Sequence, residues 1–124
     1  MRLVHRPSDD AEERTDGPAE RVLASDVDVA RSALGRARGL MFRRSIADDS
    51  ALVFEFDGAE PRWLHMLFVP FAIDAVWLVD GEVTRTKRLR PFVGLGRARA
   101  DTVVELPAGA ADAVGDGDEL RLVE

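Results

Sequence analysis

The chain contains no cysteine, and this absence excludes several kinds of chemistry at once. Disulfides, thiolate metal sites and cysteine nucleophiles all require a residue that the sequence lacks. Histidine is scarce too: His5 and His65 are the only two, and no H-E-x-x-H or comparable ligand pattern is present. No apolar run approaches the roughly 20 residues of a membrane-spanning helix. We therefore expect no metal, no cofactor and no membrane partner.

Lysine is nearly missing as well, because Lys87 is the only lysine among 17 basic residues. Aspartate and glutamate number 23, and the net charge is −6. Such a composition is typical of salt-adapted proteomes and of high-GC genomes, in archaea or bacteria. In the salt-adapted case the acidic surface serves solubility rather than a partner. Residues 1–20 contain no apolar stretch of a secretory signal, so we expect a cytoplasmic protein.

What is present fits one globular domain over residues 1–124. Hydrophobic residues make up 46% and charged residues 32%, as in folded rather than disordered chains. Residues 6–20 hold two prolines and six acids and predict an acidic exposed loop. Leu3 and Val4, before this loop, predict a strand that pairs with residues 21–24. The alternative is a disordered tail that includes the first five residues.

One main helix is predicted from about Ala30 to Leu40. Apolar residues recur there at three- and four-residue intervals, which favours an apolar helical stripe. Ser25 or Asp26 supplies a cap for free backbone N–H groups, and Gly39 suits the left-handed position that ends a helix. A second, short helix is predicted at residues 107–114.

The rest of the chain predicts strands. Alternating and short apolar runs are bounded by turn residues, and Asp80-Gly81 between two such runs is a strong hairpin signal. The fold class is therefore α+β and β-rich: a small barrel or packed antiparallel sheets of about seven strands, with the main helix against them. The remaining predicted strands cover residues 51–56, 63–69, 73–79, 82–89, 102–106 and 120–123.

Five short motifs occur in the order found in one conserved family. They are Arg38-Gly39-Leu40-Met41-Phe42-Arg43, the F-x-F strand 51–56, Ile73-Asp74 followed by Asp80-Gly81, the V-E-L-P-A-G run 104–109, and Gly117-Asp118. On these motifs residues 21–124 resemble the family called domain of unknown function 192. The resemblance implies a compact β-rich domain without an established activity.

The sequence departs from that family at its central W-M-K-N-T motif. His65, Met66, Leu67, Phe68 and Val69 stand at the corresponding places, so apolar side chains replace the family's polar Lys, Asn and Thr. An activity that depends on that polar cluster is therefore not expected here.

Two polar residues lie in apolar strands. Asp74 is surrounded by apolar residues, where a carboxylate must be exposed, be paired with an arginine such as Arg38 or Arg43, or serve as a site acid. We favour the first two alternatives. His65, between Leu64 and Met66, is interpreted as a hydrogen-bonded core or groove residue. Trp63 and Trp77 are interpreted as core or groove residues as well.

Basic residues are segregated along the chain. Residues 29–47 contain five arginines and no acid, and residues 83–100 contain six basic residues and no acid. Either they contact a phosphate-bearing ligand or nucleic acid, or they pair with the surplus carboxylates, which we favour. The contact candidates are Arg36, Arg38, Arg43, Arg44, Arg85, Lys87, Arg88 and Arg90.

Three functional hypotheses remain. The first is a non-enzymatic ligand- or protein-binding accessory domain, with an apolar groove around Trp63, His65 and Phe68. The second is an anion-binding module or enzyme, in which Arg38, Arg43, His65 and Asp74 converge on one pocket. The third is a nucleic-acid binder through segments 31–44 and 85–99, which the net negative charge and the few aromatic residues near those segments argue against. We favour the first and assign no catalytic residue.

Overall fold

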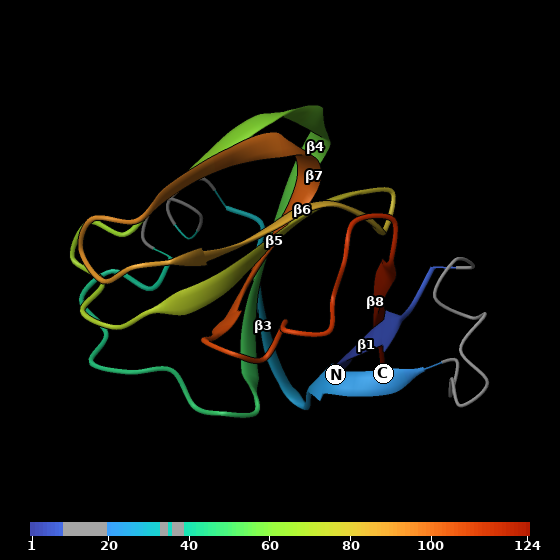
Figure 1. Cartoon of the computed structure of the whole chain (residues 1–124), viewed down its shortest axis with the longest axis horizontal. Coiled ribbons are helices and arrows are strands. Elements are labelled where there is room, and N and C mark those ends of the chain that lie inside the picture. Colours follow the sequence, from blue (N-terminus) through green and yellow to red (C-terminus); the bar gives the residue numbers. More distant parts are fainter. Residues whose placement is uncertain (9–19, 33–34, 36–38) are drawn as a thin grey trace.

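The chain folds into one eight-stranded sheet. A computed structural model describes residues 1–8, 20–32, 35 and 39–124, and Figure 1 traces the strands along the chain. The strand order across the sheet is β2-β1-β8-β6-β5-β7-β4-β3, and every neighbouring pair is antiparallel except β3 and β4. The strands are β1 (Arg2–Arg6), β2 (Arg21–Ala24), β3 (Asp26–Ala30), β4 (Ser50–His65), β5 (Ile73–Val79), β6 (Glu82–Leu89), β7 (Leu95–Pro107) and β8 (Glu119–Val123).

The predicted main helix is not supported. Residues 26–30 form β3, which lies parallel to β4 with Asp26 opposite Ser50, and Leu40 lies in a turn. Residues 33–34 and 36–38 of the predicted helix lie outside the described residues. Val27 and Val29 alternate with aspartates, and this two-residue period, together with the free edge of β4, favours a strand over a helical stripe.

The predicted short helix at residues 107–114 is also wrong. Three successive turns replace it, in which Ala110 N donates to Pro107 O, Asp112 N to Gly109 O, and Val114 N to Ala111 O. Gly109 has a φ of 96°, which lies outside the helical region and breaks the run.

The central strands are apolar on both faces, because a hydrophobic core packs against each side of the sheet. Along β5, Val76 and Leu78 belong to one core while Ala75 and Trp77 belong to the other, and β4 and β7 divide in the same way. This explains their nearly continuous hydrophobic runs. Trp77, fully buried, donates its indole N–H to the carbonyl of Arg62 at 3.0 Å. The prediction of a core position is therefore confirmed for Trp77.

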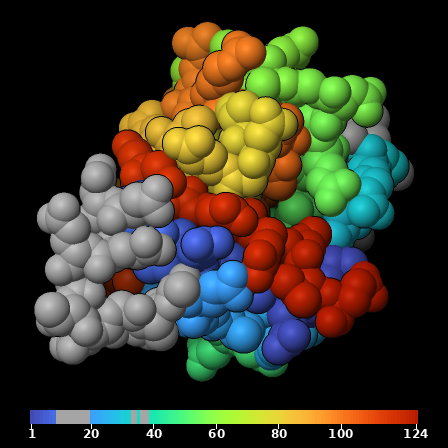
Figure 2. Space-filling view, turned by 90° about the vertical axis from the view of Figure 1, so that its right-hand side faces the viewer, coloured from blue at the N-terminus to red at the C-terminus, as the bar shows by residue number. Residues whose placement is uncertain are grey.

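The chain ends lie together at one side of the molecule. The predicted first strand is confirmed, since β1 pairs with both β2 and β8. Figure 2 shows the N-terminal segment, in blue, beside light-blue and red atoms of these later segments. Buried His5 donates through Nε2 to the Asp118 carboxylate at 2.8 Å, and Arg21 donates to His5 Nδ1 at 3.2 Å. Burial alone would raise the pKa of Asp118, but hydrogen bonds from Gly115 N, His5 and Ser8 N together hold that pKa below its ordinary value.

The predicted hairpin at Asp80-Gly81 is confirmed. Both residues have positive φ, 50° and 82°, as the turn between β5 and β6 requires. No helix among the described residues is long and apolar enough to cross a membrane.

Candidate functional site

Three loops come together at the end of the sheet opposite the chain ends, at the left of Figure 1. Backbone hydrogen bonds join them: Phe42 N donates to Phe68 O at 2.9 Å, Phe92 N to Val69 O at 3.0 Å, and Met66 N to Gly94 O at 3.0 Å. The three segments therefore form one continuous surface. We call its exposed apolar residues the loop patch: Phe42, Leu67, Phe68, Phe92 and Val93.

The loop patch is exposed to an unusual degree for apolar side chains. Phe42 is 67% exposed, Phe92 59% and Val93 73%. Trp63 and Leu95 extend the apolar surface along the outer face of β4 and β7, at 63% and 50% exposure. Exposed apolar side chains gathered on adjoining loops mark an interaction site more often than scattered exposed residues do.

The phenylalanines of the loop patch are held in a strained backbone conformation. Phe42, Phe68 and Phe92 have φ of 67°, 60° and 63°, and Asp80 is the only other non-glycine residue among those described with positive φ. A left-handed backbone costs about 1–2 kcal/mol for an L-residue with a side chain. Such strain persists where function requires it, so these positions are candidates for a binding role.

Basic residues surround this surface largely without acidic partners. Segments 40–47, 61–73 and 83–100 contain no acid. Arg85 donates to the carbonyl of Arg97 at 2.8 Å and Lys87 to that of Leu95 at 2.7 Å, so both long side chains lie along β7. Among the described residues, ion pairing accounts for one predicted contact, Arg88, and leaves five without a carboxylate partner: Arg43, Arg44, Arg85, Lys87 and Arg90.

Asp74 is a structural carboxylate. It is 5% exposed and accepts hydrogen bonds from Arg88 Nε at 2.8 Å, Gly109 N at 2.9 Å and Ala111 N at 3.0 Å. The predicted pairing with an arginine is therefore found, but the partner is Arg88 on β6. This carboxylate ties β5, β6 and the 107–114 turns together.

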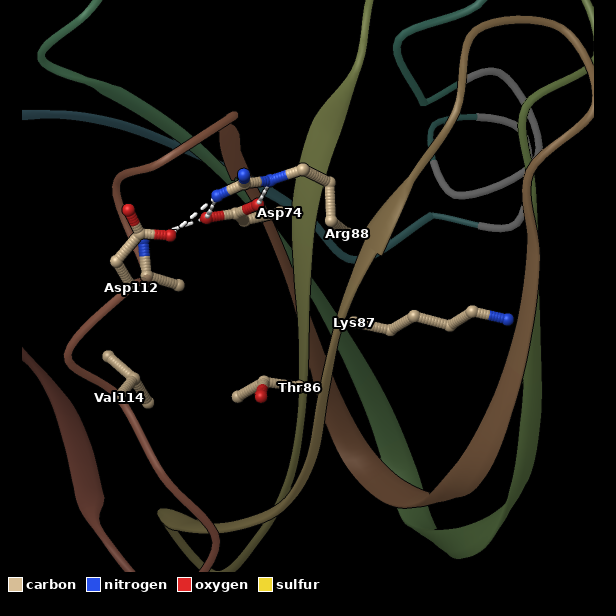
Figure 3. Close-up of a pocket in the computed structure, with 7 residues that line it drawn as sticks. Asp74, Thr86, Lys87, Arg88, Asp112 and Val114 are labelled. Atoms are coloured by element: carbon tan, nitrogen blue, oxygen red, sulfur yellow. Dashed lines mark hydrogen bonds and ion pairs between the residues drawn. The ribbon is translucent and has the colours of Figure 1, made fainter.

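An open hollow of about 280 Å³ lies beside Asp74 (Figure 3). The guanidinium of Arg88, which lines the hollow, points toward both Asp74 and Asp112 and is already paired with each of them. Lys87 extends away from the hollow. No free cation therefore points into this hollow among its lining residues, and it is a poor candidate for an anion site.

The other predicted site residues do not converge. His65 is exposed, and its Nδ1 accepts a hydrogen bond from Leu67 N at 3.2 Å, so it is not a core histidine. Trp63 is 63% exposed, with the Arg97 guanidinium 5.4 Å from the centroid of its ring, so it is not a core residue. Arg38 lies outside the described residues. Arg43, His65 and Asp74 share no hydrogen bond or ion pair, and the described residues hold no cluster of three metal-ligating side chains.

Glu105 is a candidate that the sequence reasoning missed. It is only 4% exposed, and burial raises its pKa to about 8, although the nearby Arg43 opposes that rise. Its Oε1 lies beneath the turn that leads to the loop patch, because a Cβ placed on Gly39 would be 3.6 Å from it. The signal was available: Glu105 is the single acid in an apolar run, as Asp74 is.

The comparisons with known proteins establish the fold. A Novosphingobium aromaticivorans protein of unknown function superposes with a TM-score of 0.79 at 18% identity, covering 98% of this chain and 84% of that one. A Sinorhizobium meliloti protein, provisionally named a transcription regulator, gives 0.75 at 22% identity, covering 97% and 92%. No curated protein matches the chain significantly. The sequence profile of domain of unknown function 192, described as an uncharacterised ACR, matches residues 13–122, and the chain belongs to that family.

Proposed function

We propose that the chain is a non-enzymatic binding domain whose loop patch docks an acidic segment of a protein partner. The observation that supports this function is the exposed apolar surface at three adjoining loops, together with nearby basic residues that have no carboxylate partner among the described residues. The partner segment carries apolar side chains to cover the loop patch and carboxylates to meet the surrounding arginines.

The composition of the loop patch and of its surroundings favours a protein partner. Interface cores are enriched in aromatic residues and arginine, which is the mixture found here. Leu67 and Val93 contribute aliphatic surface, at 54% and 73% exposure. Nucleic-acid bases gain most from stacking on aromatic rings, so these aliphatic residues favour apolar side chains as the occupant.

The charge distribution favours one orientation of an acidic partner on the chain. The whole chain carries −6, yet the segments that form the loop patch and its border carry only basic residues. An acidic partner is therefore attracted to this end of the molecule and repelled elsewhere, which raises the association rate and fixes orientation.

Selection from a random 12-residue peptide display library tests this proposal. Peptides enriched on the immobilised chain should combine acidic with apolar residues and should bind the Phe42→Ser/Phe92→Ser variant at least tenfold more weakly. Val22→Ser is the matched control, because Val22 is 48% exposed on β2 at the other end of the molecule. Enriched peptides that bind both variants equally would refute the proposal, as would a preference for basic peptides.

A further inference from the structure

The Glu105 carboxyl lies close to Gly39, three residues before Phe42 of the loop patch, and has no hydrogen-bond partner among the described residues. No described residue donates to its carboxyl group, although Glu105 is 4% exposed. No fully buried side-chain oxygen or nitrogen among the described residues lacks a partner, so the Glu105 oxygens must keep a narrow opening to the surface. An almost buried polar group that is left unpaired requires an explanation, and a ligand atom is one.

The surroundings of Glu105 define what that ligand atom would be. Leu52 on β4 and Ala75 on β5 lie opposite it in the sheet, and Phe54 packs beside Gly39 above it. These neighbours are apolar. Arg43 is the one charged side chain among the described residues that acts on the carboxyl.

We infer that Arg43 and Glu105 together form an anchor site for one carboxylate of the acidic partner, an inference that rests on the proposed function. Arg43 supplies a guanidinium, which pairs with carboxylates in a fork geometry. Glu105, in its neutral form, donates its O–H to a carboxylate oxygen, as neutral acids in apolar sites do. Both groups are then satisfied by one ligand group.

The position of Arg43 connects the anchor to the loop patch. Arg43 directly follows Phe42, whose ring stacks on Phe68 with the centroids 4.9 Å apart. A partner whose apolar side chain covers this stacked pair brings a neighbouring carboxylate to Arg43. The anchor therefore specifies where along the partner an acid must follow an apolar residue.

The anchor makes a prediction about pH. The neutral form of Glu105 predominates below a pKa of about 8, and the ionised form repels a ligand carboxylate. Affinity should therefore be full at pH 6.5 and fall by at least about tenfold at pH 9.5, where most of the carboxyl is ionised. Among the described residues, Arg43 is the only charged group that influences the pKa of the Glu105 carboxyl.

An NMR titration with sodium acetate at constant ionic strength tests the anchor in the intact chain. With carboxyl-labelled glutamate, acetate at pH 6.5 should shift the Glu105 carboxyl resonance and the Gly39 amide saturably, and much less at pH 9.5. Glu105→Gln keeps a donor but cannot ionise, so it should bind equally at both pH values. Arg43→Gln should weaken binding at both, while the control Arg2→Gln, an exposed arginine on β1 beside the chain ends, should not.

Several outcomes would overturn the anchor: a pH dependence that persists in Glu105→Gln, equal effects of Arg43→Gln and Arg2→Gln, or no saturable shift at Gly39. Tighter binding of inorganic phosphate than of acetate would overturn the carboxylate assignment and favour a phosphate ligand. The titration needs no partner peptide. If acetate causes no saturable shift while the selected peptides still bind the Phe42→Ser/Phe92→Ser variant more weakly, only the anchor is refuted. If the peptides bind that variant and Val22→Ser equally well, the proposed function is refuted.

Discussion

The rings of Phe42 and Phe68 stack with an interplanar angle of 21°, although both residues hold a left-handed backbone. Phe42 also donates its backbone N–H to the Phe68 carbonyl, so ring and backbone contacts act on the same pair. A stacked pair contributes about 0.5–1.5 kcal/mol beyond its buried area. That is less than the combined backbone cost at the two positions, so presenting the two rings to solvent lowers the stability of the fold on balance.

Phe92 allows the strain to be separated from the binding role. Glycine at this position relieves the left-handed backbone, whereas alanine keeps the strain and removes the ring. Phe92→Gly should therefore be more stable than Phe92→Ala by about 1 kcal/mol in urea denaturation. Both variants should lose peptide affinity equally. Equal stabilities would show that the positive φ at Phe92 stores no strain.

The stability of the fold should decrease as the pH rises from about 4.5 to about 8. Glu105 holds its proton to about pH 8 in the folded chain but loses it near its ordinary value in the unfolded chain. The folded state therefore binds more protons in this window, and the free energy of unfolding falls by up to about 1.4 kcal/mol per pH unit.

Denaturation curves of the wild type and Glu105→Gln at matched pH values isolate this contribution, because glutamine cannot ionise. The variant should show a flatter profile between pH 4.5 and 8 than the wild type. Profiles of equal slope would mean that Glu105 ionises in the folded chain at its ordinary pKa.

Asp74→Asn should destabilise the fold by roughly 2–3 kcal/mol. The substitution removes the negative charge that pairs with Arg88. It also replaces one of the two carboxylate oxygens, which together accept from Arg88 and from the Gly109 and Ala111 N–H groups, by an NH₂ group that cannot accept. Asp112→Asn is the matched control, since its side chain is 71% exposed and its ion pair contributes less than about 1 kcal/mol. Thermal denaturation measures both, and equal shifts would contradict a structural role for Asp74.

Gly96→Ala should destabilise the fold by about 1–3 kcal/mol. A Cβ at Gly96 would lie 2.6 Å from the Trp77 ring. Because Trp77 is fully buried, its ring has little room to move away. Gly58→Ala provides the comparison, because a Cβ there meets nothing within 4 Å. Chemical denaturation of the two variants should separate them clearly. A neutral Gly96→Ala would mean that the ring and the β4–β7 ribbon can shift apart.

Much of the strand pattern was predictable from local sequence. Turn chemistry at Asp80-Gly81 identified the β5–β6 hairpin, and the apolar residues near the N-terminus identified β1. The main helix from about Ala30 to Leu40 is not supported, because Ala30 ends the strand β3 beside β4 and Leu40 lies in a turn. A free strand edge is a property of the sheet, and no local pattern reports it.

The candidate site shows the same division. Two unusual features could be read from the sequence: an acid in an apolar strand, and arginines set apart from acids. The spatial grouping of the site residues required the tertiary structure. Hydrogen bonds between distant segments place Phe42, Phe68 and Phe92 on one surface. The fold also pairs Asp74 with Arg88 and places Glu105 beneath Gly39. Side-chain chemistry is local to each residue, whereas proximity depends on hydrogen bonds between strands and loops far apart along the chain.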